Sequence, residues 1–167
     1  YARERVKKEN LDIQFIIGDS SQLELEENSF DLVFYSFNGL QLIPGYDNRA
    51  NVLKKSYCLL KNGGYMIFTA HDREVEMFKD FWSQEKEKWD KGLNSKDAEL
   101  FGDMYIYENG GTGFIHYSSI DELKNFIFTN SKFKIVEYLN RSDIIDESEQ
   151  IKNWSSDTVF WVLRKEI

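Results

Sequence analysis

With 167 residues, the chain has room for one domain, or for a domain with a small insertion. Its 21 Lys and Arg residues against 29 Asp and Glu residues give a net charge of −8, which repels a phosphate backbone at long range and argues against nucleic acid as a partner. No stretch approaches the ~18 apolar residues of a membrane helix, and the single cysteine, Cys58, rules out an internal disulfide and indicates a reducing, cytoplasmic compartment.

The first part of the chain predicts alternating strands and helices. Residues 1–10 have the spacing of the end of an amphipathic helix, and residues 47–60 have the spacing of a complete one. Gly63 and Gly64 end the second helix, since glycine accepts the left-handed conformation there. Three short, nearly continuous apolar runs are typical of buried strands, and they cover residues 13–17, 30–37 and 64–69. The last two strands and the helix between them predict a parallel unit with a right-handed crossover.

The second part of the chain changes character. Residues 73–91 predict a helix that carries several aromatic side chains, Phe78, Phe81, Trp82 and Trp89. Alternating residues in 104–108 and 113–117, on either side of the turn 109–112, predict a hairpin. We expect residues 73–117 to be an insertion, either a lid over a bound substrate or an ordinary layer packed on the sheet.

A capping box and two more strands complete the predicted fold. Ser119 and Glu122 have the spacing at which a hydroxyl and a carboxylate each satisfy a free N–H, which predicts a helix as far as about residue 129. Residues 133–139 and 158–164 predict strands, and the polar segment between them is longer than a usual hairpin loop.

Polar residues follow each of the three apolar runs. They include Asp19 and Ser20 after the first, Ser36 and Asn38 at the second, and His71 after the third. Because open parallel sheets bind ligands at the carboxyl ends of their strands, we expect a binding site there. An Asp in this place can accept a hydrogen bond from an amino group while the next N–H donates to a ring nitrogen, which suits the edge of an adenine. The alternative is that Asp19 only caps the following turn.

Two segments of the sequence together resemble a known protein family. The segment G-D-S-S-Q-L-E-L-E-E-N-S-F-D-L-V-F, and then L-L-K-N-G-G-Y-M-I-F-T, is similar to the middle of class I S-adenosylmethionine-dependent methyltransferases. Asn62 stands where the family usually has proline. The resemblance is strongest over residues 12–69 and looser in the hairpin and in residues 140–157.

The resemblance implies a single α/β domain over residues 1–167. Its sheet would be Rossmann-like and mostly parallel, with an antiparallel edge strand and the insertion described above. Asp19 would receive the adenine amino group, and the Ser20 N–H would meet a ring nitrogen. The residues that would border the methionine part of the cofactor are Tyr35, Ser36 and Phe37. Tyr35 and Phe37 are also readable as core aromatic residues.

Two features of the family pattern are missing from the sequence. The family has a glycine-rich loop after its first strand and an acidic residue at the end of its second strand, and neither is present here. The chain begins at Tyr1 rather than at a methionine. We therefore expect an incomplete domain that lacks its first strands, with exposed sheet edges that favour association. We also expect the 167-residue chain to bind S-adenosylmethionine weakly or not at all.

The sequence also provides candidates for contact with a methyl acceptor. They are Asn38, His71 and Arg73, of which His71 is a weak candidate for a general base. His116 is more readily interpreted as structural. No Cys and His residues have metal-ligand spacing, so we expect no metal site. The family's Asn/Asp-Pro-Pro-Tyr signature for nucleic-acid bases is absent, which together with the net charge favours a small-molecule acceptor.

Two other functions remain open at this stage. A chain that keeps the fold without the cofactor loop is compatible with a non-catalytic module that binds a ligand or a partner. Another nucleotide-dependent enzyme, such as an oxidoreductase, is disfavoured because S-F-D-L-V followed by L-K-N-G-G fits methyltransferases better.

Overall fold

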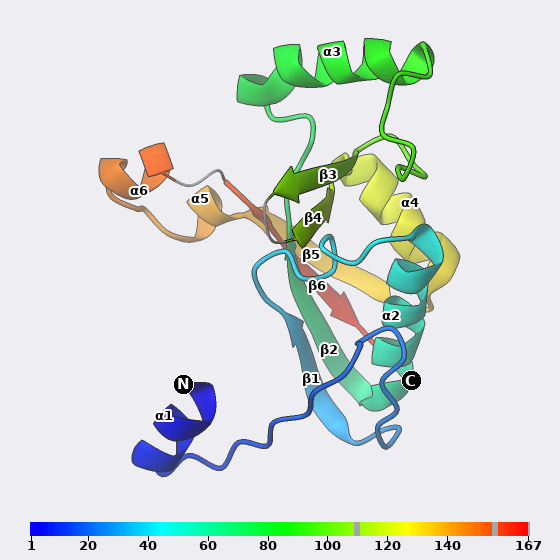
Figure 1. Ribbon diagram of the computed structural model, residues 1–167. Coiled ribbons are helices and arrows are strands. Elements are labelled where there is room, and N and C mark those ends of the chain that lie inside the picture. The colour runs from blue at the N-terminus through cyan, green and yellow to red at the C-terminus, as the bar shows by residue number, and fades with distance from the viewer. Residues whose placement is uncertain (109–110, 155–156, 167) are drawn as a thin grey trace.

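A computed structural model describes residues 1–108, 111–154 and 157–166 of the chain (Figure 1). The elements in chain order are α1 (Ala2–Lys8), β1 (Phe30–Tyr35), α2 (Tyr46–Leu59), β2 (Leu60–Ala70), the 3₁₀ turn η1 (Glu76–Phe78), α3 (Lys79–Asp90), β3 (Asp103–Glu108), β4 (Gly111–His116), α4 (Ile120–Asn130), β5 (Lys134–Asn140), α5 (Arg141–Ile144), α6 (Glu149–Trp154) and β6 (Val159–Arg164).

The central sheet has four strands in the order β1-β2-β6-β5. β1 and β2 are parallel neighbours joined through α2, which confirms the predicted unit. β6 runs antiparallel to both β2 and β5, so the other three strands share one direction. The sheet is therefore mostly parallel in direction, as expected, but its antiparallel strand lies inside the sheet rather than at the edge.

Side-chain burial explains this place of β6. Val159, Trp161 and Leu163 alternate along the strand, and all three are buried. β5 exposes all of its residues except Ile135, which is half-buried. The more apolar strand takes the interior position because it gains more from being covered, while the polar strand tolerates an edge.

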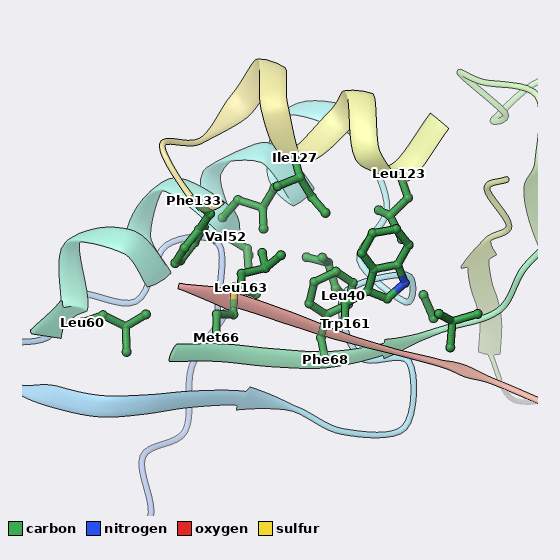
Figure 2. Close-up of a cluster of buried hydrophobic side chains, with 13 residues drawn as sticks. Leu40, Val52, Leu60, Met66, Phe68, Leu123, Ile127, Phe133, Trp161 and Leu163 are labelled. Atoms are coloured by element: carbon green, nitrogen blue, oxygen red, sulfur yellow. The ribbon is translucent and has the colours of Figure 1, made fainter. Parts of the chain in front are cut away.

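The core lies on one face of the sheet, beneath α2 and α4 (Figure 2). Val52 from α2 and Ile127 from α4 meet Phe68 of β2 and Trp161 of β6, and all four side chains are fully buried. The opposite face of β1 is open, since Leu32 and Phe34 are about half exposed. The prediction that these strands are buried on both faces is therefore wrong for β1 among the residues that the structure describes.

The strand predicted over residues 13–17 is not formed. Its backbone has no ladder partner in the described part of the chain, and Ile13, Phe15 and Ile17 are exposed. A strand is stable only when neighbours satisfy its N–H and C=O groups, which an apolar run alone does not provide. The predicted first helix is formed as α1, although no residue of it is buried.

The helix predicted over residues 73–91 begins later than expected. Asp72 forms a bridge to Ser118, and the Arg73 N–H donates to the Ser118 carbonyl. Residues 73–74 then form a turn, so η1 begins only at Glu76 and α3 at Lys79. The hairpin is formed by β3 and β4, while residues 109–110 of its predicted turn lie outside the described residues.

The capping box at Ser119 is confirmed in full. Its hydroxyl accepts from the Glu122 N–H at 3.2 Å, and the Glu122 carboxylate accepts from the Ser119 N–H at 2.9 Å. The predicted strands near the C-terminus are β5 and β6, and the polar segment between them contains the short helices α5 and α6.

Candidate functional site

The turn after β1 has an unusual backbone. Phe37 and Asn38 have φ values of 52° and 57°, in the left-handed region that side-chain-bearing residues seldom adopt. The Asn38 N–H donates to Thr69 Oγ1 at 2.8 Å, which holds this turn against the end of β2. Phe37 is 88% exposed, so its ring is not part of the core. Residues held in such sparsely populated backbone regions cluster at functional sites.

Asp19 and Ser20 lie beside the end of β1. Tyr35 hydrogen-bonds with the Ser20 side chain, and burial raises the pKa of the Tyr35 hydroxyl. The structure thus brings together Ser20 and Tyr35, which the resemblance assigns to one cofactor site. Ser36 is exposed next to them.

The Asp19 carboxylate is engaged in its own turn. It accepts from the Ser21 N–H and hydroxyl, both at 2.8 Å, and from Gln22 Nε2 at 3.3 Å. The Ser21 hydroxyl, followed by the Ser21 N–H, lowers the pKa of Asp19. This is the turn-capping role that the sequence left open as the alternative. Because the carboxylate is exposed, its oxygens keep room for a further donor.

His71 sits in a hydrogen-bond network that spans three segments. Its Nε2 lies 2.8 Å from Asn38 Nδ2, and the ring also bonds to the backbone of Asp157. The His71 N–H and C=O both bond to the Gln41 side chain, at 2.8 and 3.1 Å. Since burial lowers the pKa of His71, the ring is held as a neutral part of this network. His71 therefore links the turn after β1 to the end of β2 and to Asp157. Its role as a general base stays a prediction.

Arg73 fastens the insertion to the body of the domain. Its guanidinium bonds to Glu122 at 2.6 Å and to the Tyr117 carbonyl at 2.9 Å, and it lies 4.5 Å from the centre of the Phe101 ring. Arg73 is buried by these contacts and by Trp82. All of them are internal, so the predicted contact of Arg73 with a substrate stays untested.

The aromatic side chains of the insertion pack mainly on one another. Trp82 is buried against Phe81, Phe101 and Tyr117, with ring centres 5.0 to 5.9 Å apart. Whether the insertion acts as a lid or as a layer packed on the sheet stays a prediction. Figure 1 places α3, with β3 and β4, beyond the end of β2. The hairpin therefore reaches the same end of the sheet as the turn after β1.

A cavity of about 260 Å³ lies between the helices and this hairpin. Its polar lining includes His116 of β4, Arg49 of α2 and Gln41 of the turn after β1. His116 Nδ1 lies 2.7 Å from Asp103 Oδ1, and the His116 N–H donates to the Gln41 carbonyl at 2.9 Å. Gln41 therefore links the cavity directly to the His71 network.

The charged groups around the cavity are paired. Burial of Asp103 opposes its ionisation. Hydrogen bonds from His116 and from the Leu100 N–H, together with the charges of His116 and Arg49, outweigh this effect. They hold the pKa of Asp103 below the ordinary value. Sequence reasoning missed Arg49, Asp103 and Gln41. The only sign of these residues in the sequence is that polar side chains occupy positions which the periodicity of a helix or a hairpin directs toward the interior.

Comparison with known proteins identifies the fold. A family model described as a methyltransferase domain matches residues 1–64 of the chain. A comparison with curated proteins finds no match. An S-adenosylmethionine-dependent methyltransferase from Methanosarcina mazei is similar to the chain in structure, with a TM-score of 0.65 and 17% identity over 92% of this chain and 68% of that one.

The chain has a class I methyltransferase fold. A second methyltransferase, from Clostridium acetobutylicum, has a TM-score of 0.65 and 11% identity over 99% of this chain and 70% of that one. The 1,6-didemethyltoxoflavin-N1-methyltransferase of Burkholderia thailandensis was solved with bound 1,6-didemethyltoxoflavin and S-adenosylhomocysteine. It has a TM-score of 0.63 and 12% identity over 99% of this chain and 56% of that one. The resemblance stated from the sequence is confirmed. The chain spans 56–70% of these three methyltransferases.

Two further findings concern the described residues of this methyltransferase fold. None of their helices is both long and apolar enough to cross a membrane. No three His, Cys, Asp or Glu side chains in the described ranges are grouped so that they could hold a metal ion.

Proposed function

We propose that the protein transfers a methyl group from S-adenosylmethionine to a small molecule. The observation that carries the proposal is the meeting of Ser20 and Tyr35 at one edge of a methyltransferase sheet, within the residues that match the family model. The alternative, a non-catalytic binding module, has no observation that favours it.

The residues at this edge fit part of the cofactor. The exposed Asp19 carboxylate has acceptor capacity for an adenine amino group, and the N–H of the adjacent Ser20 would donate to a ring nitrogen. The turn of residues 36–38 would lie along the methionine part. No described residue forms a glycine-rich cradle at this edge, so we expect binding by these residues alone to be weak. When bound, the cofactor supplies an electrophilic methyl group on a sulfonium.

The contribution of the protein to such a reaction is mainly orientation. A sulfonium methyl is already reactive, so holding the acceptor in line supplies much of the rate enhancement. The positive-φ turn at Phe37 and Asn38, fastened to Thr69, is the rigid element that would do so.

A small acceptor is favoured by the size of the cavity and by charge. The cavity of about 260 Å³ suits a single small molecule. The net charge of −8 disfavours nucleic acid. The methyltransferase from Burkholderia thailandensis, which shares the fold, holds a small molecule in its structure. We also propose a cytoplasmic location, on the basis of the single, exposed Cys58.

Calorimetry tests the proposed function. We expect the protein isolated from its source to bind S-adenosylhomocysteine, and an Asp19→Ala variant to bind it about fivefold more weakly or worse, as expected for one lost hydrogen bond. Ser21→Ala is the control, because it disturbs the same turn but leaves the carboxylate in place. Failure of the isolated protein to bind would refute the proposal and would favour the non-catalytic module.

A further inference from the structure

The cavity beside His116 has apolar walls and one end that is polar. Its walls come from both core and insertion, namely Leu40, Tyr46, Phe68, Leu100, Phe101, Leu123 and Phe126. Its volume of about 260 Å³ is far above the ~10–15 Å³ that a single buried water needs. One ring with small substituents fills such a space. Apolar walls with few polar groups are typical of small-molecule sites.

Ser118 gives this cavity an unsatisfied hydroxyl. The residue is 4% exposed and lines the cavity, and its Oγ has no hydrogen-bond partner within the described structure. Buried hydroxyl groups are normally paired, because an unpaired one costs free energy. A ligand with a polar atom at this point would remove that cost.

His116 provides a second polar contact. Its Nδ1 is held by Asp103 at 2.7 Å, and its backbone N–H is held by Gln41, so the orientation of the ring is fixed. With Nδ1 engaged, Nε2 is the ring nitrogen left for a ligand in the cavity. A carboxylate that holds one imidazole nitrogen leaves the other as a hydrogen-bond acceptor and general base.

The charges around the cavity cancel in pairs. Arg49 lies 3.8 Å from Asp103, and Arg73 lies 2.6 Å from Glu122. The Arg49 guanidinium also donates to the Ile43 carbonyl at 3.0 Å. A charged ligand would have to separate one of these pairs or remain without a counter-ion, and both cost free energy at a buried site. A neutral ligand avoids that cost.

We infer that this cavity binds the methyl acceptor, that the acceptor is a neutral, ring-sized molecule with an O–H or N–H group, and that His116 Nε2 takes its proton. The inference rests on the proposed function for its methyl-transfer step, but the binding of such a molecule does not depend on it. Leu40 and Gln41, on the cavity wall, belong to the same turn as Phe37 at the proposed cofactor edge.

The step balances with S-adenosylmethionine as co-reactant. The acceptor oxygen or nitrogen forms a bond to the methyl carbon as the carbon–sulfur bond breaks, and sulfur keeps that electron pair. The acceptor proton passes to His116 Nε2 and from there to solvent. The products are the methylated acceptor and S-adenosylhomocysteine.

Binding of simple probes tests the site without cofactor. Phenol, benzoate and benzylamine share one ring and differ in charge, and amide chemical shifts of the ¹⁵N-labelled chain report where each binds. We expect phenol to bind more tightly than the other two and to shift amides of Gln41, His116 and Ser118. Tighter binding of benzoate or benzylamine, or phenol-induced shifts elsewhere in the chain, would overturn the inference.

Two substitutions locate the polar contacts. His116→Asn keeps a donor for Asp103 and removes the nitrogen in the cavity, and Ser118→Ala removes only the unpaired hydroxyl. We expect each to weaken phenol binding about fivefold, as for one hydrogen bond, with the melting temperature of His116→Asn nearly unchanged. Unchanged phenol affinity in both variants would contradict the assignment.

Failure of this inference and failure of the proposed function are distinguishable. Binding of S-adenosylhomocysteine without binding of phenol removes the cavity assignment and leaves methyl transfer standing. Binding of phenol at the cavity without binding of S-adenosylhomocysteine removes the methyl-transfer step and leaves the neutral-ligand site standing. With an acceptor found, His116→Asn should lower kcat by about 10²-fold or more.

Discussion

Ser118 and Ser119 are adjacent and both buried, but their hydroxyl groups are in opposite states. The Ser119 hydroxyl caps α4, whereas that of Ser118 has no partner. We expect Ser119→Ala to lower the free energy of unfolding by about 1 kcal/mol, because an N–H of the helix loses its acceptor. Ser118→Ala should leave it unchanged or raise it, because the substitution removes an unpaired buried hydroxyl. Urea denaturation of the two variants measures the difference, and equal losses would contradict this account.

His71 makes stability depend on pH. Burial lowers the pKa of His71 below the ordinary histidine value of 6.5, so below that pH the unfolded chain binds the proton more readily than the folded chain. Stability from this group is complete above pH 6.5 and falls as the pH drops toward the folded pKa. We expect His71→Gln to flatten the profile of melting temperature between pH 7 and pH 5. An unchanged slope in the variant would show that another group is responsible.

Asp103 and Glu122 act in a more acidic range. In each case burial opposes ionisation, but the hydrogen bond from His116 or Arg73 and the other donors outweigh it and lower the pKa. Their contribution is present above the ordinary carboxyl range and is lost as the pH falls through the folded pKa values. They therefore do not obscure the contribution of His71.

Single residues were predictable where the chemistry is local. The capping box at Ser119 depends on four consecutive residues and is confirmed. The turn around Asp19 was left open between two roles, and its internal hydrogen bonds appear only in the structure. The sequence favours a structural His116 because it alternates with Phe114 in the predicted hairpin, but it does not reveal the pairing of His116 with Asp103 on the neighbouring strand.

At the scale of elements, Gly102 determines how the hairpin meets the sheet. Its φ is 101°, and a Cβ there would lie 2.0 Å from the Tyr117 carbonyl oxygen. We expect Gly102→Ala to lower the free energy of unfolding by about 3 kcal/mol, because both the backbone and the contact are strained. Gly92→Ala is the matched control, since its φ is 67° with open space around it, and it should cost about 1 kcal/mol. Similar losses from the two substitutions would contradict this assignment.

β1 is an edge strand with exposed apolar side chains. Leu32 and Phe34 are 50% and 55% exposed, and no described strand pairs with its free edge. Such edges pair readily with other chains. We expect concentration-dependent association in sedimentation velocity, and we expect Leu32→Lys to reduce it. Leu93→Lys, at an exposed site in the insertion, is the control and should have no effect. Association that persists unchanged in Leu32→Lys would exclude β1 as the contact.

Elements with strong periodicity were predictable from the sequence, but the strands with which they pair in the sheet were not. The sequence predicts α2, α4, β1, β5 and β6 close to their observed bounds. For β2 the prediction is wrong at the start, because the strand begins at Leu60 and contains Gly63 and Gly64, which were expected to end the preceding helix. Residues 13–17 have the composition of a strand but find no partner among the described residues. β6 lies inside the sheet because it gains more from burial than β5 does. The residue pattern of one strand alone does not contain that comparison.

At the scale of the whole molecule, the fold was recognised because motifs occur in a fixed order. S-F-D-L-V in β1 and L-K-N-G-G at the start of β2 flank one crossover helix, and this arrangement carries the class I methyltransferase resemblance. The cavity was not predicted. It forms where the turn after β1, α2, α4 and the hairpin meet, and such a meeting depends on tertiary packing rather than on any one segment.

The most direct test of the account is the place at which cofactor binds. Weak binding is measurable by NMR, so the ¹⁵N-labelled 167-residue chain can be titrated with S-adenosylhomocysteine to millimolar concentration. The account predicts amide shifts that increase with concentration and gather at Asp19, Ser20 and residues 35–38. Shifts that gather in other parts of the chain instead would contradict it.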